Sequence, residues 1–119
     1  MIIDDDVDLS HILANVLEKK KIRAMEVHSL SDAEDYLAFL KPTIIFLDNS
    51  FPEGLGVNFI RLIRSAGEDI KIVMMTADNA NWIREKAINE GVHYFMQKPL
   101  DLHTIDKALA NLNIHPYPL

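Results

Sequence analysis

Carboxylate, hydroxyl and amine side chains follow four apolar runs of this 119-residue sequence, at or near the point where each run ends. They are Asp4, Asp5, Asp6, Asp48, Thr76 and Lys98. Carboxylates about 5 Å apart repel one another by roughly 3 kcal/mol per pair at an effective dielectric constant near 20, so a cluster of them requires a nearby cation. Mg²⁺ accepts such oxygen ligands and neutralises charge as a phosphoryl group moves. If these side chains converge, they predict phosphoryl chemistry at a Mg²⁺ site.

Within such a site Asp48 is the candidate nucleophile, because a carboxylate can form an aspartyl phosphate as a covalent intermediate. Lys98 would pair with the phosphoryl charge, and the Thr76 hydroxyl would donate a hydrogen bond to a phosphoryl oxygen. Asp6 and Asp8 instead favour the N-terminus of a helix, where carboxylates accept from free amides.

The side chains can meet only if the apolar runs form one parallel sheet, because ligands bind at the carboxyl ends of parallel strands. The expected strands are residues 1–3, 23–27, 43–47, 70–75 and 94–96. Segments of helical period separate them, which is the pattern of strands joined by crossover helices. The apolar run of residues 44–47 does not alternate, which predicts a central strand covered on both faces.

The helices between these strands carry start and stop signals. The stripe from Leu9 to Leu17 predicts the first helix, and a second helix is expected to begin at a capping box from Ser31 to Glu34. Gly67 and Gly91 stand where the third and fourth helices should end. A fifth stripe runs from Leu102 to Leu112.

Composition limits the classes of function. A chain of 119 residues with 49% hydrophobic residues fits one domain, and the absence of cysteine excludes disulfides and thiol nucleophiles. The formal net charge of −6 disfavours direct nucleic-acid binding. No apolar run is long enough to span a membrane, and no basic and apolar leader opens the sequence, so we expect a cytoplasmic domain without membrane contact.

Four motifs occur at the strand ends: Ile3-Asp4-Asp5-Asp6, Leu47-Asp48 followed by Pro52 and Gly56, Met75-Thr76-Ala77, and Gly91 leading through Phe95 to Lys98-Pro99. Together they resemble the receiver domain of two-component response regulators over nearly the whole chain. The resemblance implies a flavodoxin-like (βα)5 three-layer sandwich with a five-stranded parallel sheet of order 2-1-3-4-5. The receiver domain would span residues 1–119, with 113–119 as a tail or the start of a lost linker.

The resemblance also implies the metal ligands and the phosphoacceptor. Asp48 would accept the phosphoryl group and bind Mg²⁺ together with Asp5 and the backbone carbonyl of Ser50. Asp4 would bind the metal ion through a water molecule. The first strand is short, so the sequence is expected to lack its natural beginning.

The resemblance further implies a pair of switch residues and two structural positions. Thr76 and Phe95 would form the switch pair, whose movement repacks the face made by the fourth helix, the fifth strand and the fifth helix. Pro99 is expected to follow a cis peptide bond that directs Lys98 into the site, and Gly56 is expected to be structural.

The implied partners are a sensor histidine kinase or a histidine phosphotransfer domain as phosphodonor, and an output domain or target protein at the switch face. Homodimerisation is left open. The domain would not be an enzyme beyond Mg²⁺-dependent self-phosphorylation and autodephosphorylation.

Two alternatives remain open from the sequence. The first is an interaction module with the receiver fold that works without phosphorylation. The second, more distant, is a haloacid dehalogenase-like phosphatase, in which Asp4 would be the nucleophile and Asp6 the general acid. The second leaves Asp48, Pro52 and Gly56 unexplained.

Overall fold

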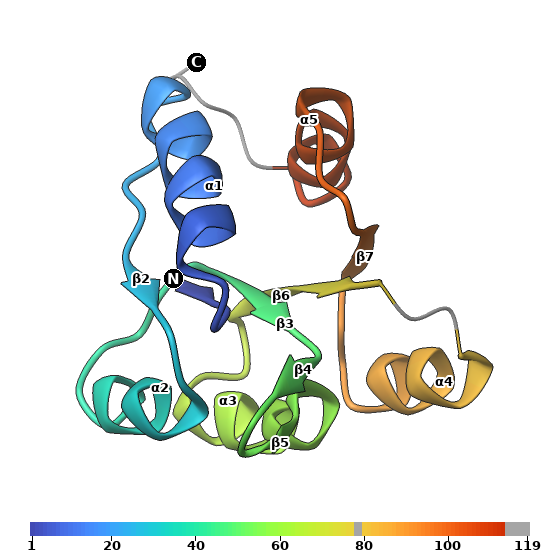
Figure 1. Cartoon of the computed structure of the whole chain (residues 1–119). Helices are drawn as coiled ribbons and strands as arrows, with labels where there is room; N and C mark the ends of the chain where they lie inside the picture. Colours follow the sequence, from blue (N-terminus) through green and yellow to red (C-terminus); the bar gives the residue numbers. More distant parts are fainter. Residues whose placement is uncertain (78–79, 114–119) are drawn as a thin grey trace.

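A computed structural model of the chain describes residues 1–77 and 80–113. Its centre is a sheet of five parallel strands, in which β1 lies between β2 and β3 (Figure 1). The strand bounds are β1 Ile2–Ile3, β2 Glu26–Val27, β3 Ile44–Asp48, β6 Lys71–Thr76 and β7 Tyr94–Gln97. The spatial order β2-β1-β3-β6-β7 confirms the predicted order 2-1-3-4-5.

Helices cover both faces of the sheet, which gives the predicted three layers (Figure 1). On one face lie α1 (Val7–Lys19) and α5 (Leu102–Asn111), and on the other lie α2 (Leu30–Leu37), α3 (Ile60–Ala66) and α4 (Asn81–Asn89). Each face has its own apolar cluster. Because every residue of β3 is buried, this strand is central, as its uninterrupted apolar sequence predicted.

The start of α2 differs from its prediction. Ser29, not Ser31, is the N-cap, and its side chain accepts from the Asp32 amide at 3.0 Å. The Leu30 and Ser31 amides donate to the carboxylate of Glu53 at 2.8 and 2.9 Å. The predicted capping box was therefore wrong, because a carboxylate from a distant loop satisfies the free amides of this helix.

Two further differences concern the strands. The second strand is shorter than its predicted range of 23–27, because it pairs with β1 only over Glu26–Val27, and before it the Ala24 amide donates to the Glu18 side chain at 3.0 Å. A small antiparallel hairpin, β4 (Ser50–Phe51) and β5 (Gly54–Leu55), and the 3-10 helix η1 (Gly56–Phe59) follow β3 and were not predicted.

Most of the predicted tail, residues 114–119, lies outside the described residues. Within residues 1–77 and 80–113, no helix has both the length and the apolar character needed to cross a membrane.

Candidate phosphoacceptor and metal site

The carboxyl ends of the strands surround a hollow of about 440 Å³. The side chains singled out at the strand ends all line it, and so do four neighbours. The lining residues are Asp4, Asp5, Asp6, Asp48, Asn49, Ser50, Leu55, Thr76, Ala77 and Lys98. The topology therefore brings together the groups that lie far apart in the sequence.

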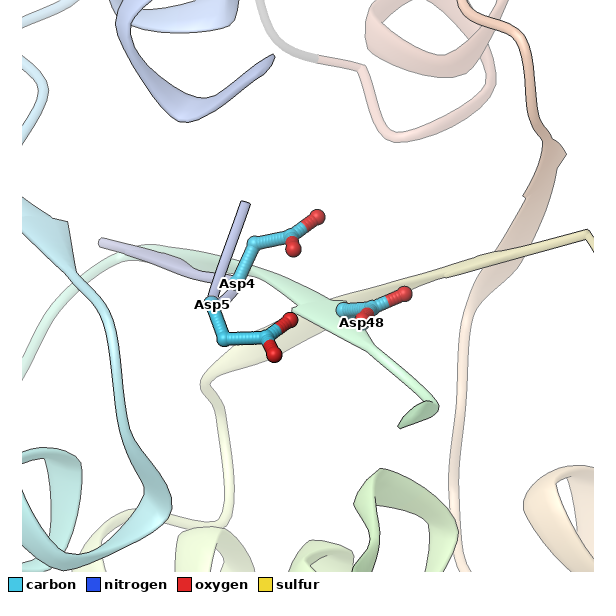
Figure 2. Close-up of side chains that lie close together, drawn as sticks. All are labelled: Asp4, Asp5 and Asp48. Atoms are coloured by element: carbon cyan, nitrogen blue, oxygen red, sulfur yellow. The ribbon is translucent and has the colours of Figure 1, made fainter. Parts of the chain in front are cut away.

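Three carboxylates converge in this hollow (Figure 2). Asp4, Asp5 and Asp48 each offer one oxygen atom, and these atoms lie within 4.8 Å of one another. Asp4 is fully buried, Asp48 is 5% exposed and Asp5 is exposed. Such a set of hard oxygen donors fits a divalent cation that keeps several water ligands, which is the usual coordination of Mg²⁺.

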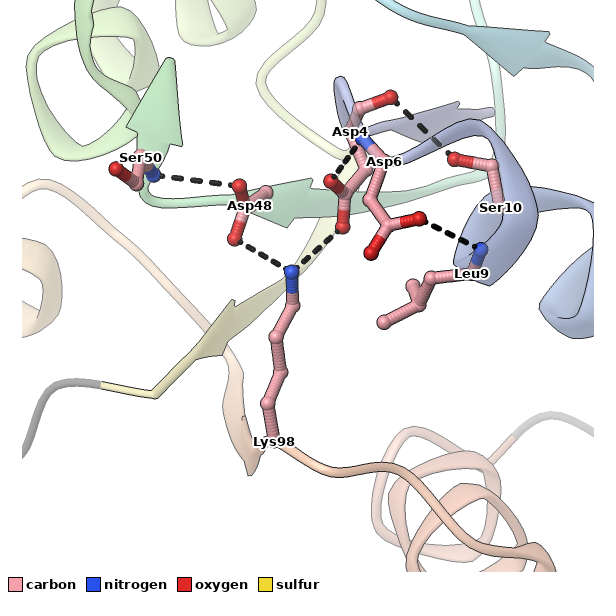
Figure 3. Close-up of polar contacts among 7 residues, drawn as sticks. All are labelled: Asp4, Asp6, Leu9, Ser10, Asp48, Ser50 and Lys98. Atoms are coloured by element: carbon pink, nitrogen blue, oxygen red, sulfur yellow. Dashed lines mark hydrogen bonds and ion pairs between the residues drawn. The ribbon is translucent and has the colours of Figure 1, made fainter.

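Lys98 bridges two of the carboxylates (Figure 3). Its ammonium group lies 2.9 Å from Asp4 Oδ2 and 3.0 Å from Asp48 Oδ1. Burial opposes its charge, but hydrogen bonds to Asp4 and Asp48 outweigh this effect and raise the pKa of Lys98. The amine therefore stays protonated and neutralises one of the three carboxylate charges, which leaves net negative charge for a cation to balance.

The environment of Asp48 disfavours its ionised form. Burial raises the pKa of Asp48, and the charge of Asp4 raises it further, against the lowering effects of Lys98 and of the Ser50 amide. That amide donates to Asp48 Oδ2 at 3.4 Å. A positive charge beside Asp48 would lower its pKa again and so favour the carboxylate, which is the nucleophilic form.

Asp4 and Asp6 have different structural roles (Figure 3). Asp4 Oδ1 accepts from the Asp6 amide at 2.9 Å, so hydrogen bonds engage both oxygens of Asp4. Asp6 is the N-cap of α1 and accepts from the Leu9 amide at 3.0 Å, as carboxylates at helix N-termini do. Asp5 and Asp6 are both exposed, but Asp6 caps the helix, so Asp5 is the exposed carboxylate that belongs to the acidic cluster.

The loop after Asp48 is held close to the strand by Gly56. A Cβ atom at Gly56 would lie 2.0 Å from the backbone oxygen of Asp48, so only glycine fits at this position. The Gly56 amide donates to the Asn49 carbonyl at 2.8 Å, and Asn49 Oδ1 accepts from the Val57 amide at 3.0 Å. Sequence reasoning did not predict that the buried Asn49 stabilises this loop, because an Asn after an Asp indicates only a turn.

Thr76 and Phe95 lie beside the site on neighbouring strands. Thr76 ends β6 and pairs in register with Gln97, whereas Phe95 pairs with Met74. A second hollow of about 140 Å³ is lined by both Thr76 and Phe95. The Lys98–Pro99 peptide bond that follows β7 is cis.

Comparison with known proteins agrees with this arrangement. Residues 1–110 match the family model described as the response regulator receiver domain. The chain belongs to this family.

Relatives and solved structures extend the likeness. The swarming motility regulation protein RssB of Serratia marcescens is 28% identical over 113 residues, which are 95% of this chain and 52% of that protein. A two-component response regulator from Clostridium difficile has a TM-score of 0.86 at 30% identity, and the likeness covers 94% of this chain and 93% of that one. The chain spans only part of the curated relatives it matches, from 25% to 61% of their length.

A response regulator from Burkholderia pseudomallei shares the fold. Its TM-score is 0.84 at 22% identity, over 91% of this chain and 64% of that one, and its crystal structure contains a phosphorylated aspartic acid, a calcium ion and citrate.

Proposed function

We propose that Asp48 is the phosphoacceptor of this receiver domain in a two-component phosphorelay. The observation that carries the proposal is the position of Asp48, a buried carboxylate at the end of the central strand, between two other carboxylates and the Lys98 ammonium group. An Asp48 oxygen attacks the phosphorus of a phosphohistidine, the P–N bond breaks, and its electron pair stays on the imidazole nitrogen, which takes up a proton. The donor is a histidine kinase or a histidine phosphotransfer domain.

Asp5, Asp48 and the Ser50 carbonyl would hold Mg²⁺, with Asp4 contributing through a water molecule. When bound, Mg²⁺ neutralises the charge that develops on the transferred phosphoryl oxygens. The exposure of Asp5 and the engagement of both Asp4 oxygens support this division of roles. The calcium ion and phosphorylated aspartic acid of the Burkholderia pseudomallei protein support a metal-assisted aspartyl phosphate.

Lys98 and Thr76 would then receive the phosphoryl group. Lys98 already contacts Asp48 at 3.0 Å, so its ammonium group can pair with a phosphoryl oxygen without a large movement. The Thr76 hydroxyl donates a hydrogen bond to another oxygen, and Phe95 moves towards the space that Thr76 leaves. This movement transmits the event to α4, β7 and α5, where an output domain, a target protein or a second copy would bind.

The proposal also covers the bounds, the location and the reactions of the domain. The domain spans the whole chain, with 113–119 as a tail or linker. It acts in the cytoplasm, beside its kinase, and its own reactions are limited to self-phosphorylation and autodephosphorylation.

The phosphatase alternative is less favoured than the receiver function. Asp4, its nucleophile, is fully buried and hydrogen-bonded at both oxygens, and Asp6, its general acid, is a helix cap.

Fluorescence of Trp82, the sole tryptophan, tests the proposed site. We expect a change in emission on addition of Mg²⁺ and beryllofluoride, a phosphoryl mimic, that requires both the metal ion and Asp48. Asp48→Asn should abolish it, whereas Asp8→Asn should preserve it, because Asp8 lies outside the acidic cluster. An unchanged spectrum in the wild type, together with no mass gain from acetyl phosphate, would instead favour an interaction module independent of phosphorylation.

A further inference from the structure

The guanidinium group of Arg84 lies over the ring of Phe95. The distance from Arg84 Cζ to the ring centroid is 4.7 Å, which is within the range of a cation–π interaction. Arg84 comes from α4 and Phe95 from β7, so this contact joins two elements of the proposed switch face. Among the described residues, no carboxylate forms an ion pair with Arg84, so its charged group faces the aromatic ring.

The hollow beside this ring has room for it to move. Its volume is about 140 Å³, and a cavity of this order accommodates a benzene molecule. Thr76, Ile83 and Arg84 line it together with Phe95. Since the ring borders the hollow without filling it, a rotation of Phe95 towards Thr76 would place the ring in this space.

We propose that Arg84 is a positioning residue that retains the Phe95 ring in its present place and so sets how readily the switch responds to phosphorylation. This inference rests on the proposed function of Asp48 and adds a regulatory contact to it. Arg84 borders the same hollow, so the inference requires that rotation towards Thr76 carries the ring out from under the guanidinium group; the contact then favours the state before phosphorylation. At an exposed site a cation–π contact changes such an equilibrium by about two- to fivefold.

The direction of this effect distinguishes it from simple electrostatics. Removing a positive charge near an anion-binding site should weaken the binding of a phosphoryl mimic, because the attraction is reduced. Removing the contact that restrains Phe95 should instead strengthen the binding of the mimic, because less free energy is needed to reach the bound state.

The test measures the apparent affinity for beryllofluoride in the presence of Mg²⁺ by ¹⁹F NMR of the bound fluorides. We expect Arg84→Met to bind about two- to fivefold more tightly than the wild type, and Arg84→Lys to lie between them. Lys86→Met is the matched control, because it removes the same charge from the same helix but pairs with Glu90. In a Phe95→Leu background, Arg84→Met should give no gain.

A second readout does not depend on the metal ion or the mimic. In the metal-free protein, Arg84→Met should shift the ¹³C-labelled ring resonances of Phe95, assigned with Phe95→Leu, and Lys86→Met should not. Equal or weaker affinity in Arg84→Met, an equal gain without the Phe95 ring, or unchanged ring resonances would each overturn the proposal. Absence of beryllofluoride binding in the wild type would instead contradict the role of Asp48, and the ring resonances would still decide the role of Arg84.

Discussion

In the metal-free protein, the surroundings of Asp48 disfavour its ionised form, which is the nucleophile of the proposed reaction. Burial and the charge of Asp4 raise its pKa, and Lys98 compensates only in part. A metal ion or a phosphoryl group that brings compensating charges or contacts would relieve this repulsion. The acidic cluster is therefore expected to lower the stability of the metal-free domain.

Asp48→Asn should accordingly raise the free energy of unfolding at neutral pH in the presence of EDTA, by about 1 kcal/mol. The pKa of Asp48 in the folded state lies above its ordinary value of 3.8. Between these two values the folded protein binds more protons than the unfolded chain, so stability falls as pH rises through the folded pKa. Urea denaturation from about pH 4 to about pH 7 should show a smaller fall in the variant.

Asp8→Asn is the matched control for this measurement, because Asp8 lies in the first turn of α1 and outside the cluster. A lower stability of Asp48→Asn than of the wild type in EDTA would contradict this account of the site.

The residues of the site were predictable because each follows a strongly apolar run. The rule that parallel strands present their carboxyl ends at one edge was enough to predict that Asp48, Thr76 and Lys98 converge. Asn49 and Arg84 could not be found in this way. The role of Asn49 depends on a loop that returns to it eight residues later, and that of Arg84 depends on a ring from another strand.

At the scale of elements, the β4–β5 hairpin, which follows β3 in the chain, contacts the N-terminus of α2. Glu53 lies in its turn, and its carboxylate accepts from the first two amides of α2. Ser50, whose carbonyl is the proposed metal ligand, lies on the same hairpin. A carboxylate at a helix N-terminus also interacts favourably with the helix dipole.

Glu53→Gln should lower the free energy of unfolding by about 0.5–1 kcal/mol and increase hydrogen exchange at the Leu30 and Ser31 amides. A matched control is Glu34→Gln, which changes the same type of side chain within α2. If Glu34→Gln exposes these amides and Glu53→Gln does not, the capping box predicted from the sequence describes the helix better than the structure does.

The elements differ in how far local sequence determines them. The buried strands β3 and β6 lie within one residue of their predicted bounds, because long apolar runs have few alternatives. The start of α2 was mispredicted because the side chain of Glu53, more than 20 residues away in the sequence, satisfies backbone amides there. Propensity contains no information on such contacts.

At the scale of the whole molecule, Met1 of the 119-residue chain is part of the core. Met1 is 8% exposed, and its ammonium group donates to the Ile44 carbonyl at 2.9 Å. Burial lowers the pKa of this amino group from 8.0 to about 6. The folded domain therefore disfavours a charge that the unfolded chain readily carries.

For the 119-residue chain with a free amino group at Met1, stability should therefore rise with pH between about 6 and about 8, because the unfolded chain binds more protons than the folded domain in this interval. The full effect is on the order of 2 kcal/mol. Burial also lowers the pKa of His93 from its ordinary value of 6.5. A rise in stability above about pH 7 is therefore due to the amino group. Thermal unfolding of the chain with a free and with an acetylated Met1 measures this, and an identical pH profile for both would refute it.

The proposed aspartyl phosphate is one covalent bond, which intact-protein mass spectrometry detects after incubation with acetyl phosphate and Mg²⁺. We expect that the wild type and Asp8→Asn each gain one phosphoryl group, that Asp48→Asn gains none, and that EDTA prevents the gain. Borohydride reduction should locate the aspartyl phosphate at Asp48. A phosphoryl group on Asp48→Asn, or on another residue of the wild type, would contradict the assignment of Asp48 as the phosphoacceptor.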